Sequence, residues 1–349
     1  MVAAMTKENR WLRKTIEFVP PDDLGIDEQL LLAHLHDRDL AAALTEKYPA
    51  PFRRCTVVPV DRQARGKPVV REAVEIAAAE RVGALIAECE RKSGPHRFFV
   101  GWGPMVNRVV SNLRPAETSV RDLLIYPLLG NFSVRLKAIH AMEAFESEPY
   151  YQHSVAYSAN KNAGIMARRC RHAPPRSLLI PAVIAAKDGW SPVDCSCVFE
   201  ADRALIETFG HFWEPADKTG IIWEPGATIL TSFGGPDRDP GNIFCRLMGY
   251  TEPLPPNMAG DIAGLAFDRS GEPITAQNRL ITGLRLEHIK GAANRFADSD
   301  PASRIGAGVM VATADDDKVS SLDVLLRNGY INELIIDEQT AGILLEYQG

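Results

Sequence analysis

The chain has 349 residues, of which 46% are hydrophobic and 24% charged, and its formal net charge is −6. This composition is typical of a globular protein with a sizeable core, and the acidic net charge does not favour nucleic-acid binding, which would need a basic stripe. No apolar run is long enough to cross a bilayer and the first residues lack the apolar core of a signal peptide, so we expect a cytoplasmic protein without a membrane partner.

The N-terminal part predicts a helix, a short strand and a second helix. Residues 27–46 have amphipathic spacing, and residues 53–60 form a short apolar run. Residues 71–94 place Ala and Leu on one face and end at a glycine, which is typical of a helix and its C-terminal stop. A strand at 97–101 follows directly.

The same alternation continues to the end of the chain. We expect strands at 123–130, 177–184, 227–235, 304–312 and 332–337, and helices at 158–170, 201–213, 320–329 and 338–347. Apolar strands separated by helices form parallel sheets that are covered on both faces. The sequence therefore predicts an α/β protein with a doubly wound, mostly parallel, Rossmann-like sheet.

The stretch 236–300 interrupts this alternation with proline-rich loops. Within it, residues 261–274 predict two short strands around a turn, with Ser270–Gly271 at the tip. We expect three parts: an N-terminal arm and amphipathic helix over 1–48, an α/β domain over 49–349, and a small lobe or lid within that domain at about 236–300.

Three predicted strands end in glycine, in the segments GWG (101–103), LLGN (128–131) and FGG (233–235). Ligands of such sheets bind beyond the carboxyl ends of the strands, and glycine there allows a close approach to the backbone. These ends predict one pocket, and three unrelated tight turns are the alternative. No nucleotide-binding or hydrolase motif is present, and Val106 departs from the dinucleotide fingerprint, so we expect no cofactor.

Neither cysteines nor histidines indicate a metal site. The six cysteines are scattered, as is typical of reduced thiols, and Cys195 and Cys197 have no second ligand pair nearby. His34, His36, Asp37 and Asp39 are better explained as a surface charge cluster. The acidic run Asp315–Asp317 suits the N-terminus of the following helix, although this does not explain Lys318.

The C-terminal motifs, taken in order, resemble the sugar-binding effector domain of SorC-family bacterial transcription regulators. FFVGWG, YPLLGN and SANKNAG match the family's glycine loop, next strand end and Asn-bearing helix start. The resemblance covers roughly residues 50–349. Its other matching positions are Gly260, Asp261, Ile262, Asp268, Gly271, Lys318, Ile331, Asn332, Leu334, Asp337, Glu338 and Ala341.

The resemblance implies a fold like that of ribose-5-phosphate isomerase and glucosamine-6-phosphate deaminase, a sugar or sugar-phosphate ligand, and a dimer or tetramer. The leucine-rich face of the 27–46 helix is a candidate for that interface. Family regulators also carry an N-terminal helix-turn-helix. Residues 1–21 are too short for one, so we expect no direct DNA binding.

The sequence departs from the family where phosphate would bind. Pro104 and Met105 stand where the family has hydroxyl residues, Leu129 where it often has Arg, and Ser158 where it often has Gln. Proline has no N–H and methionine no donor. We therefore expect a neutral sugar, a polyol or a sugar acid. Trp102 either stacks on the sugar or packs in the core.

Two functions fit these residues. The first is a carbohydrate sensor linked to the transcriptional regulation of carbohydrate catabolism, without a DNA-binding domain of its own. The alternative is a sugar isomerase, lyase or deglycosylating enzyme, in which Asp261 moves a proton and Lys318 stabilises the enediolate. In a purely structural alternative, Asp261 caps a turn and Lys318 pairs with the acidic run. The candidate ligand-binding residues are Gly101, Trp102, Gly103, Gly130, Asn131, Asn160, Gly234, Gly235, Asp261 and Lys318.

Overall fold

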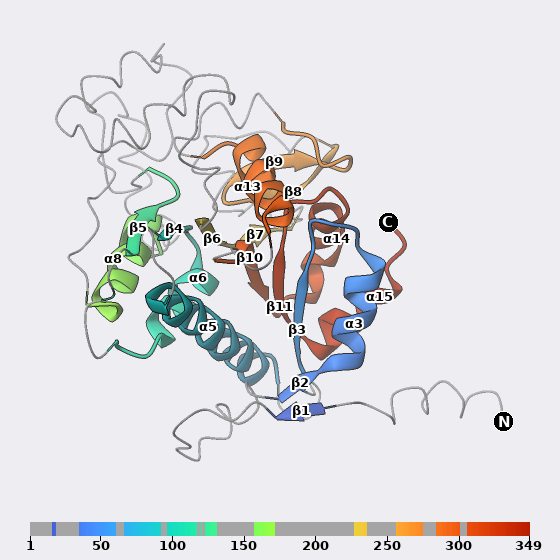
Figure 1. The fold of residues 1–349 in the computed structure, drawn as a ribbon. Coiled ribbons are helices and arrows are strands. Elements are labelled where there is room, and N and C mark those ends of the chain that lie inside the picture. Colours follow the sequence, from blue (N-terminus) through green and yellow to red (C-terminus); the bar gives the residue numbers. More distant parts are fainter. Residues whose placement is uncertain are drawn as a thin grey trace, which may run out of the picture.

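The structure is a computed structural model (Figure 1). It describes residues 16–18, 35–60, 66–91, 96–116, 120, 123–130, 157–171, 227–235, 256–274, 284–300 and 306–349. The strand expected at 177–184 and the helix expected at 201–213 lie outside these residues.

A six-stranded sheet forms the centre of the described part. Its neighbouring strands are all parallel, and their apolar runs are buried, as expected for a sheet covered on both faces. The order is β3 (Arg54–Val58), β11 (Glu333–Asp337), β10 (Gly308–Thr313), β6 (Ala227–Thr231), β4 (His96–Val100) and β5 (Leu123–Pro127).

Helices cover both faces of this sheet and divide the core into two layers. Because strand side chains alternate, Val309 and Val311 of β10 belong to one hydrophobic cluster, whereas Met310 and Ala312 belong to the other. The predicted doubly wound α/β class is therefore confirmed. The first layer contains α3 (Arg38–Lys47), α13 (Leu286–Asp298), α14 (Val319–Arg327) and α15 (Glu338–Glu346), and the second contains α5 (Lys67–Arg91), α6 (Pro104–Asn112) and α8 (Ala159–Arg169).

A small antiparallel sheet adjoins the large one. It consists of β7 (Phe233–Gly234), β8 (Met258–Ile262) and β9 (Leu265–Asp268), and β8 packs on α14, where Ser321 Oγ donates to the Ala259 carbonyl over 2.5 Å. The expected strand 227–235 is thus two strands, β6 and β7. The expected turn at Ser270–Gly271 is present, because the Gly271 N–H donates to the Asp268 carbonyl, and a second turn at Ala263–Gly264 joins β8 to β9.

Helix α13 lies within the stretch predicted to form a separate lobe. Its Leu286, Ile289 and Ala293 are buried in the same cluster as the strands of the large sheet. The division of the chain at residue 48 and the lobe at 236–300 stay predictions.

The prediction of a helix over 27–46 is wrong at residues 35–37, which are the first of that range that the structure describes. Residues Leu35–Asp37 form β2, which pairs with β1 (Ile16–Phe18), and α3 begins at Arg38. The side chain of Asp37 causes this change, because its Oδ1 accepts from the N–H groups of Asp39 (3.1 Å) and Leu40 (3.0 Å). Asp37 is 1% exposed, so it does not belong to a surface charge cluster either.

The leucines of α3 face inward. Leu40 and Leu44 are buried in the first core layer, since α3 packs on α15 and β3. The proposal that this face joins an oligomer interface is therefore wrong for these two leucines. No helix among the described residues is long and apolar enough to cross a membrane, and Cys55, Cys89 and Cys170 form no disulfide.

Candidate functional site

The carboxyl ends of β6, β4 and β5 lie side by side in the sheet. The chain leaves β4 towards β5 and leaves β6 towards β10, so the strand order changes direction between β4 and β6. Such a switch point opens a crevice for ligands. Gly101–Gly103, Gly130 and Gly234–Gly235 follow these three strands, whereas Asn131 lies outside the described residues.

The glycine loop after β4 bonds mainly to the protein itself. The Gly101 N–H donates to the Leu230 carbonyl over 2.8 Å, and the Gly103 N–H donates to the Tyr157 carbonyl over 2.9 Å. A Cβ on Gly101 would lie 2.8 Å from Thr231 Oγ1, and Gly103 has a φ of +109°. The two glycines therefore have a structural role, and their amides are already used.

The helix that follows this loop begins at Pro104, with Gly103 as an N-cap that has no side-chain bond. Trp102 is partly buried and packs against the first core layer, and its carbonyl accepts from Ser232 Oγ over 2.8 Å. Trp102 therefore takes part in core packing, and the stacking of a sugar on its exposed part stays a prediction.

Asn162, which the sequence analysis missed, holds the loop in place. Its Nδ2 donates to the carbonyls of Gly101 (3.0 Å) and Tyr157 (3.2 Å), and its Oδ1 accepts from Asn107 Nδ2. Asn162 is fully buried, whereas Asn160, the predicted contact, is half-buried in the first turn of α8. The sequence does indicate that Asn162 is buried, because position 162 lies on the apolar face of this helix, with Ala159, Ala163 and Met166.

Asp261 and Lys318 lie on either side of the glycine pair that follows β6. Asp261 pairs with Gly234 in the small sheet, and a Cβ on Gly234 would collide with Asp261 Oδ1. A Cβ on Gly235 would lie 3.5 Å from Lys318 Cγ. Asp261 is 5% exposed and its Oδ2 accepts from the Gly264 N–H over 3.0 Å. The structure therefore brings four of the predicted residues together.

Lys318 also belongs to a cluster of charges around Asp315. Its Nζ lies 2.9 Å from Asp315 Oδ2. Arg71 of α5 pairs with the other carboxylate oxygen, from which Lys67 Nζ is 3.6 Å away. Burial acts to raise the pKa of Asp315, but Lys318 and Arg71 outweigh it and lower the pKa to about 2. Asp315 is the N-cap residue of the short 3-10 helix η6 (Asp316–Lys318), as expected for the acidic run, but its side chain makes no cap bond.

Part of the chain matches a protein family. Residues 255–346, which include Asp261 and Lys318, match the model of the family described as "Putative sugar-binding domain". No curated protein sequence matches the chain.

The fold is similar to that of several solved regulator structures. The full-length sorbitol operon regulator SorC of Klebsiella pneumoniae has a TM-score of 0.59 at 18% identity, over 99% of this chain and 89% of that one. The protein described as "Probable sor Operon Regulator" of Shigella flexneri has a TM-score of 0.55 at 18% identity, over 88% of this chain and 98% of that one. A DeoR-family transcriptional regulator of Listeria monocytogenes has a TM-score of 0.59 at 16% identity, over 88% of this chain and 98% of that one. Residues 255–346 thus match the sugar-binding domain family, and the described chain has the fold of these SorC- and DeoR-type regulators.

Proposed function

We propose that the chain binds a carbohydrate at the carboxyl edge of its sheet and acts as the sensing part of a regulator of carbohydrate catabolism. The observation that carries this proposal is the position of Asp261 and Lys318 on either side of Gly234–Gly235, inside the segment that matches the sugar-binding family. Carboxylate oxygens accept from sugar hydroxyls and a lysine ammonium donates to them.

The glycine pair lets the two charged side chains lie against the backbone. A Cβ on Gly234 would collide with Asp261 Oδ1, and a Cβ on Gly235 would lie 3.5 Å from Lys318 Cγ. Lys318 is 31% exposed and keeps donor capacity beyond its bond to Asp315, since an ammonium has three N–H donors. These features suit a hydroxyl-rich ligand.

The proposed ligand is an unphosphorylated sugar, a polyol or a sugar acid. The helix after β4 begins at Pro104, which has no N–H, and the Gly103 N–H already bonds to Tyr157. A phosphate at this loop would lack two of the N–H donors that such loops supply, those of positions 103 and 104. The regulators with this fold support the proposed link to transcription.

A thermal-unfolding screen with neutral sugars, polyols, sugar acids and sugar phosphates tests the proposal. A ligand at about 100 times its Kd adds about 2.7 kcal/mol to the free energy of unfolding, so we expect a clear rise in Tm for one of the first three groups. If sugar phosphates stabilise the protein more than their unphosphorylated counterparts, the assignment of ligand class is wrong. If no carbohydrate raises Tm, the proposal itself fails.

A further inference from the structure

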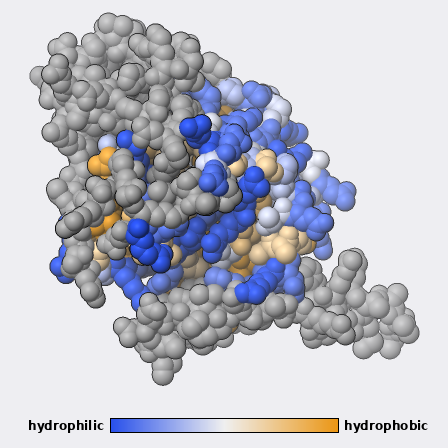
Figure 2. Space-filling model, viewed as in Figure 1, coloured by the Kyte–Doolittle hydropathy of each residue, from blue (hydrophilic) through white to orange (hydrophobic). Residues whose placement is uncertain are grey.

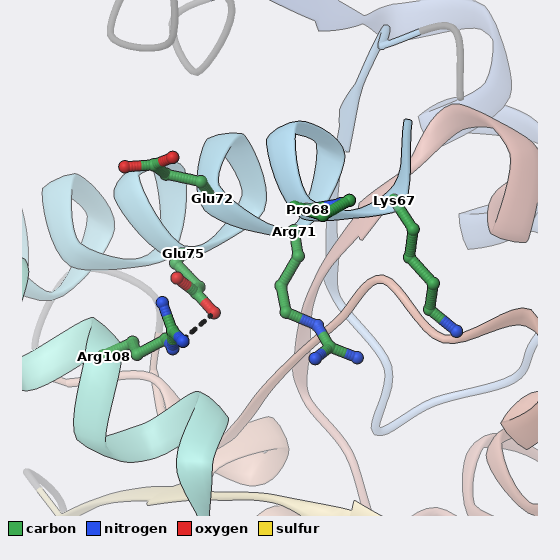
Figure 3. Close-up of a pocket in the computed structure, with 6 residues that line it drawn as sticks. All are labelled: Lys67, Pro68, Arg71, Glu72, Glu75 and Arg108. Atoms are coloured by element: carbon green, nitrogen blue, oxygen red, sulfur yellow. Dashed lines mark ion pairs between the residues drawn. The ribbon is translucent and has the colours of Figure 1, made fainter. Parts of the chain in front are cut away.

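A pocket lies between α5 and α6, next to Asp315, and none of the proposed carbohydrate-binding residues lines it. Its volume is about 410 Å³, within the range of small-molecule sites. Figure 3 shows that the side chains of Lys67, Arg71 and Glu75 leave the same side of α5, that Arg108 reaches Glu75 from α6, and that Glu72 points the other way. The lining residues are Lys67, Pro68, Arg71, Glu72, Glu75 and Arg108.

Glu75 is a buried carboxyl in the wall of this pocket. It is 1% exposed, and among the described residues no hydrogen-bond partner reaches its Oε1. Arg108 Nε lies 3.6 Å away, which is too far for a good hydrogen bond. A buried polar atom without a partner is costly, so this oxygen suits a ligand atom that would bond to it.

Burial raises the pKa of Glu75 to about 7. The charged groups that face it are Arg108 and Arg71, which lower the pKa, and Glu72 and Asp315, which raise it. A large share of Glu75 is therefore protonated at neutral pH. A protonated carboxyl donates a hydrogen bond, so in this form the wall of the pocket offers a donor.

The other donors at the pocket are cationic. The side chains of Lys67, Arg71 and Arg108 are 47%, 40% and 58% exposed. Asp315 neutralises Lys67 and Arg71 in part, but Arg71 Nε is buried and has no partner among the described residues. The charge of Arg108 is opposed by Glu75, which is only partly ionised. Guanidinium groups with spare donors bind carboxylate and phosphate oxygens well.

We infer that the pocket between α5 and α6 binds a small anion, through a carboxylate or phosphate group that accepts from Arg108, from Arg71 and from the protonated carboxyl of Glu75. This site is separate from the carbohydrate site. Asp315 connects the two, because it pairs with Arg71 at the pocket and with Lys318 beside Gly235.

Calorimetric titration with sulfate, at an ionic strength fixed with chloride, tests this inference. Sulfate keeps its charge between pH 6 and pH 8, so a change in affinity reports on the protein. The protonated fraction of a group with a pKa of about 7 falls about tenfold over this range, and we expect sulfate affinity to fall by about the same factor. Glu75→Gln, which always carries a donor, should bind sulfate with no such pH dependence.

Arg108→Gln should weaken sulfate binding about tenfold or more, as expected for the loss of a charge-assisted hydrogen bond. Arg114→Gln is the matched control, because Arg114 follows α6, pairs with Glu80 of α5 at 3.2 Å and lies outside the pocket lining. The inference is overturned if wild-type protein gives no heat of sulfate binding. It is also overturned if Arg108→Gln binds sulfate as tightly as the wild type, or if Arg108→Gln and Arg114→Gln lose sulfate affinity equally.

Parallel titrations with inorganic phosphate and citrate show which anionic group fits better. The result is independent of the proposed function. Arg108→Gln should still bind the carbohydrate, and sulfate should still bind if no carbohydrate does.

Discussion

At the residue scale, Asp315 makes contacts that sequence reasoning did not foresee. It was expected to favour a helix N-terminus, yet it pairs with Lys67, Arg71 and Lys318. The spacing of three residues made the Lys318 contact foreseeable, and the alternative that Lys318 pairs with the acidic run is confirmed. The partners on α5 were not foreseeable, because they are more than 240 positions away and meet Asp315 only through the topology of the sheet.

The charge of Asp315 gives a pH-dependent contribution to stability. Its pKa falls from 3.8 to about 2 on folding, so its charge stabilises the fold above about pH 4, and this contribution disappears as the pH falls towards 2. We expect Asp315→Asn to lower the free energy of unfolding by about 1–2 kcal/mol at pH 7, allowing for the exposure of the cationic partners. Urea unfolding should show this difference shrinking at low pH. A difference that stays constant from pH 7 to pH 2 would contradict the assignment.

The candidate site was predictable in part. Gly234, Gly235, Asp261 and Lys318 meet in the structure. The two glycines were identified from the end of a predicted strand, and Asp261 and Lys318 from the family resemblance. Asn162 and the pocket around Glu75 were not found. Whether a helical Asn bonds to a loop, and whether two helices leave a cavity between them, depends on packing that local patterns do not encode.

At the scale of elements, the contact between the glycine loop and β6 fixes the carboxyl edge. Gly101→Ala should be destabilising by about 1–3 kcal/mol, because its Cβ would lie 3.1 Å from Thr231 Cα and 3.2 Å from the Leu230 carbonyl. Gly83→Ala on α5 is the control, since nothing lies within 4 Å of its Cβ. It should be stabilising by about 0.5–1 kcal/mol. Thermal unfolding of the two variants measures the contrast, and equal effects would refute this account of the loop.

Most described elements were predictable because their patterns are local. The helix expected at 71–94 is observed at Lys67–Arg91, and the strand expected at 332–337 at Glu333–Asp337. The prediction failed where one side chain overrode the pattern, as Asp37 does before α3. No helix was expected at α13, because its buried face becomes clear only against the sheet.

At the scale of the whole molecule, we expect a dimer or tetramer. Figure 2 shows that the described surface on one face is largely hydrophilic, with small apolar areas. Leu124 of β5, which ends the described sheet, and Ile343 are 38% and 39% exposed. Light scattering at micromolar concentration should give two or four times the chain mass of 38.4 kDa, and a monomeric mass would refute the expectation.

The central claim is that Lys318 and Asp261 bind a carbohydrate at the carboxyl edge. Its most direct test is calorimetric titration of the best carbohydrate from the screen into wild-type protein, Lys318→Met and Arg114→Gln. Lys318→Met keeps the aliphatic chain but removes the donor, so affinity should fall about tenfold or more, whereas Arg114→Gln should bind like the wild type. Equal affinities for all three proteins would contradict the claim.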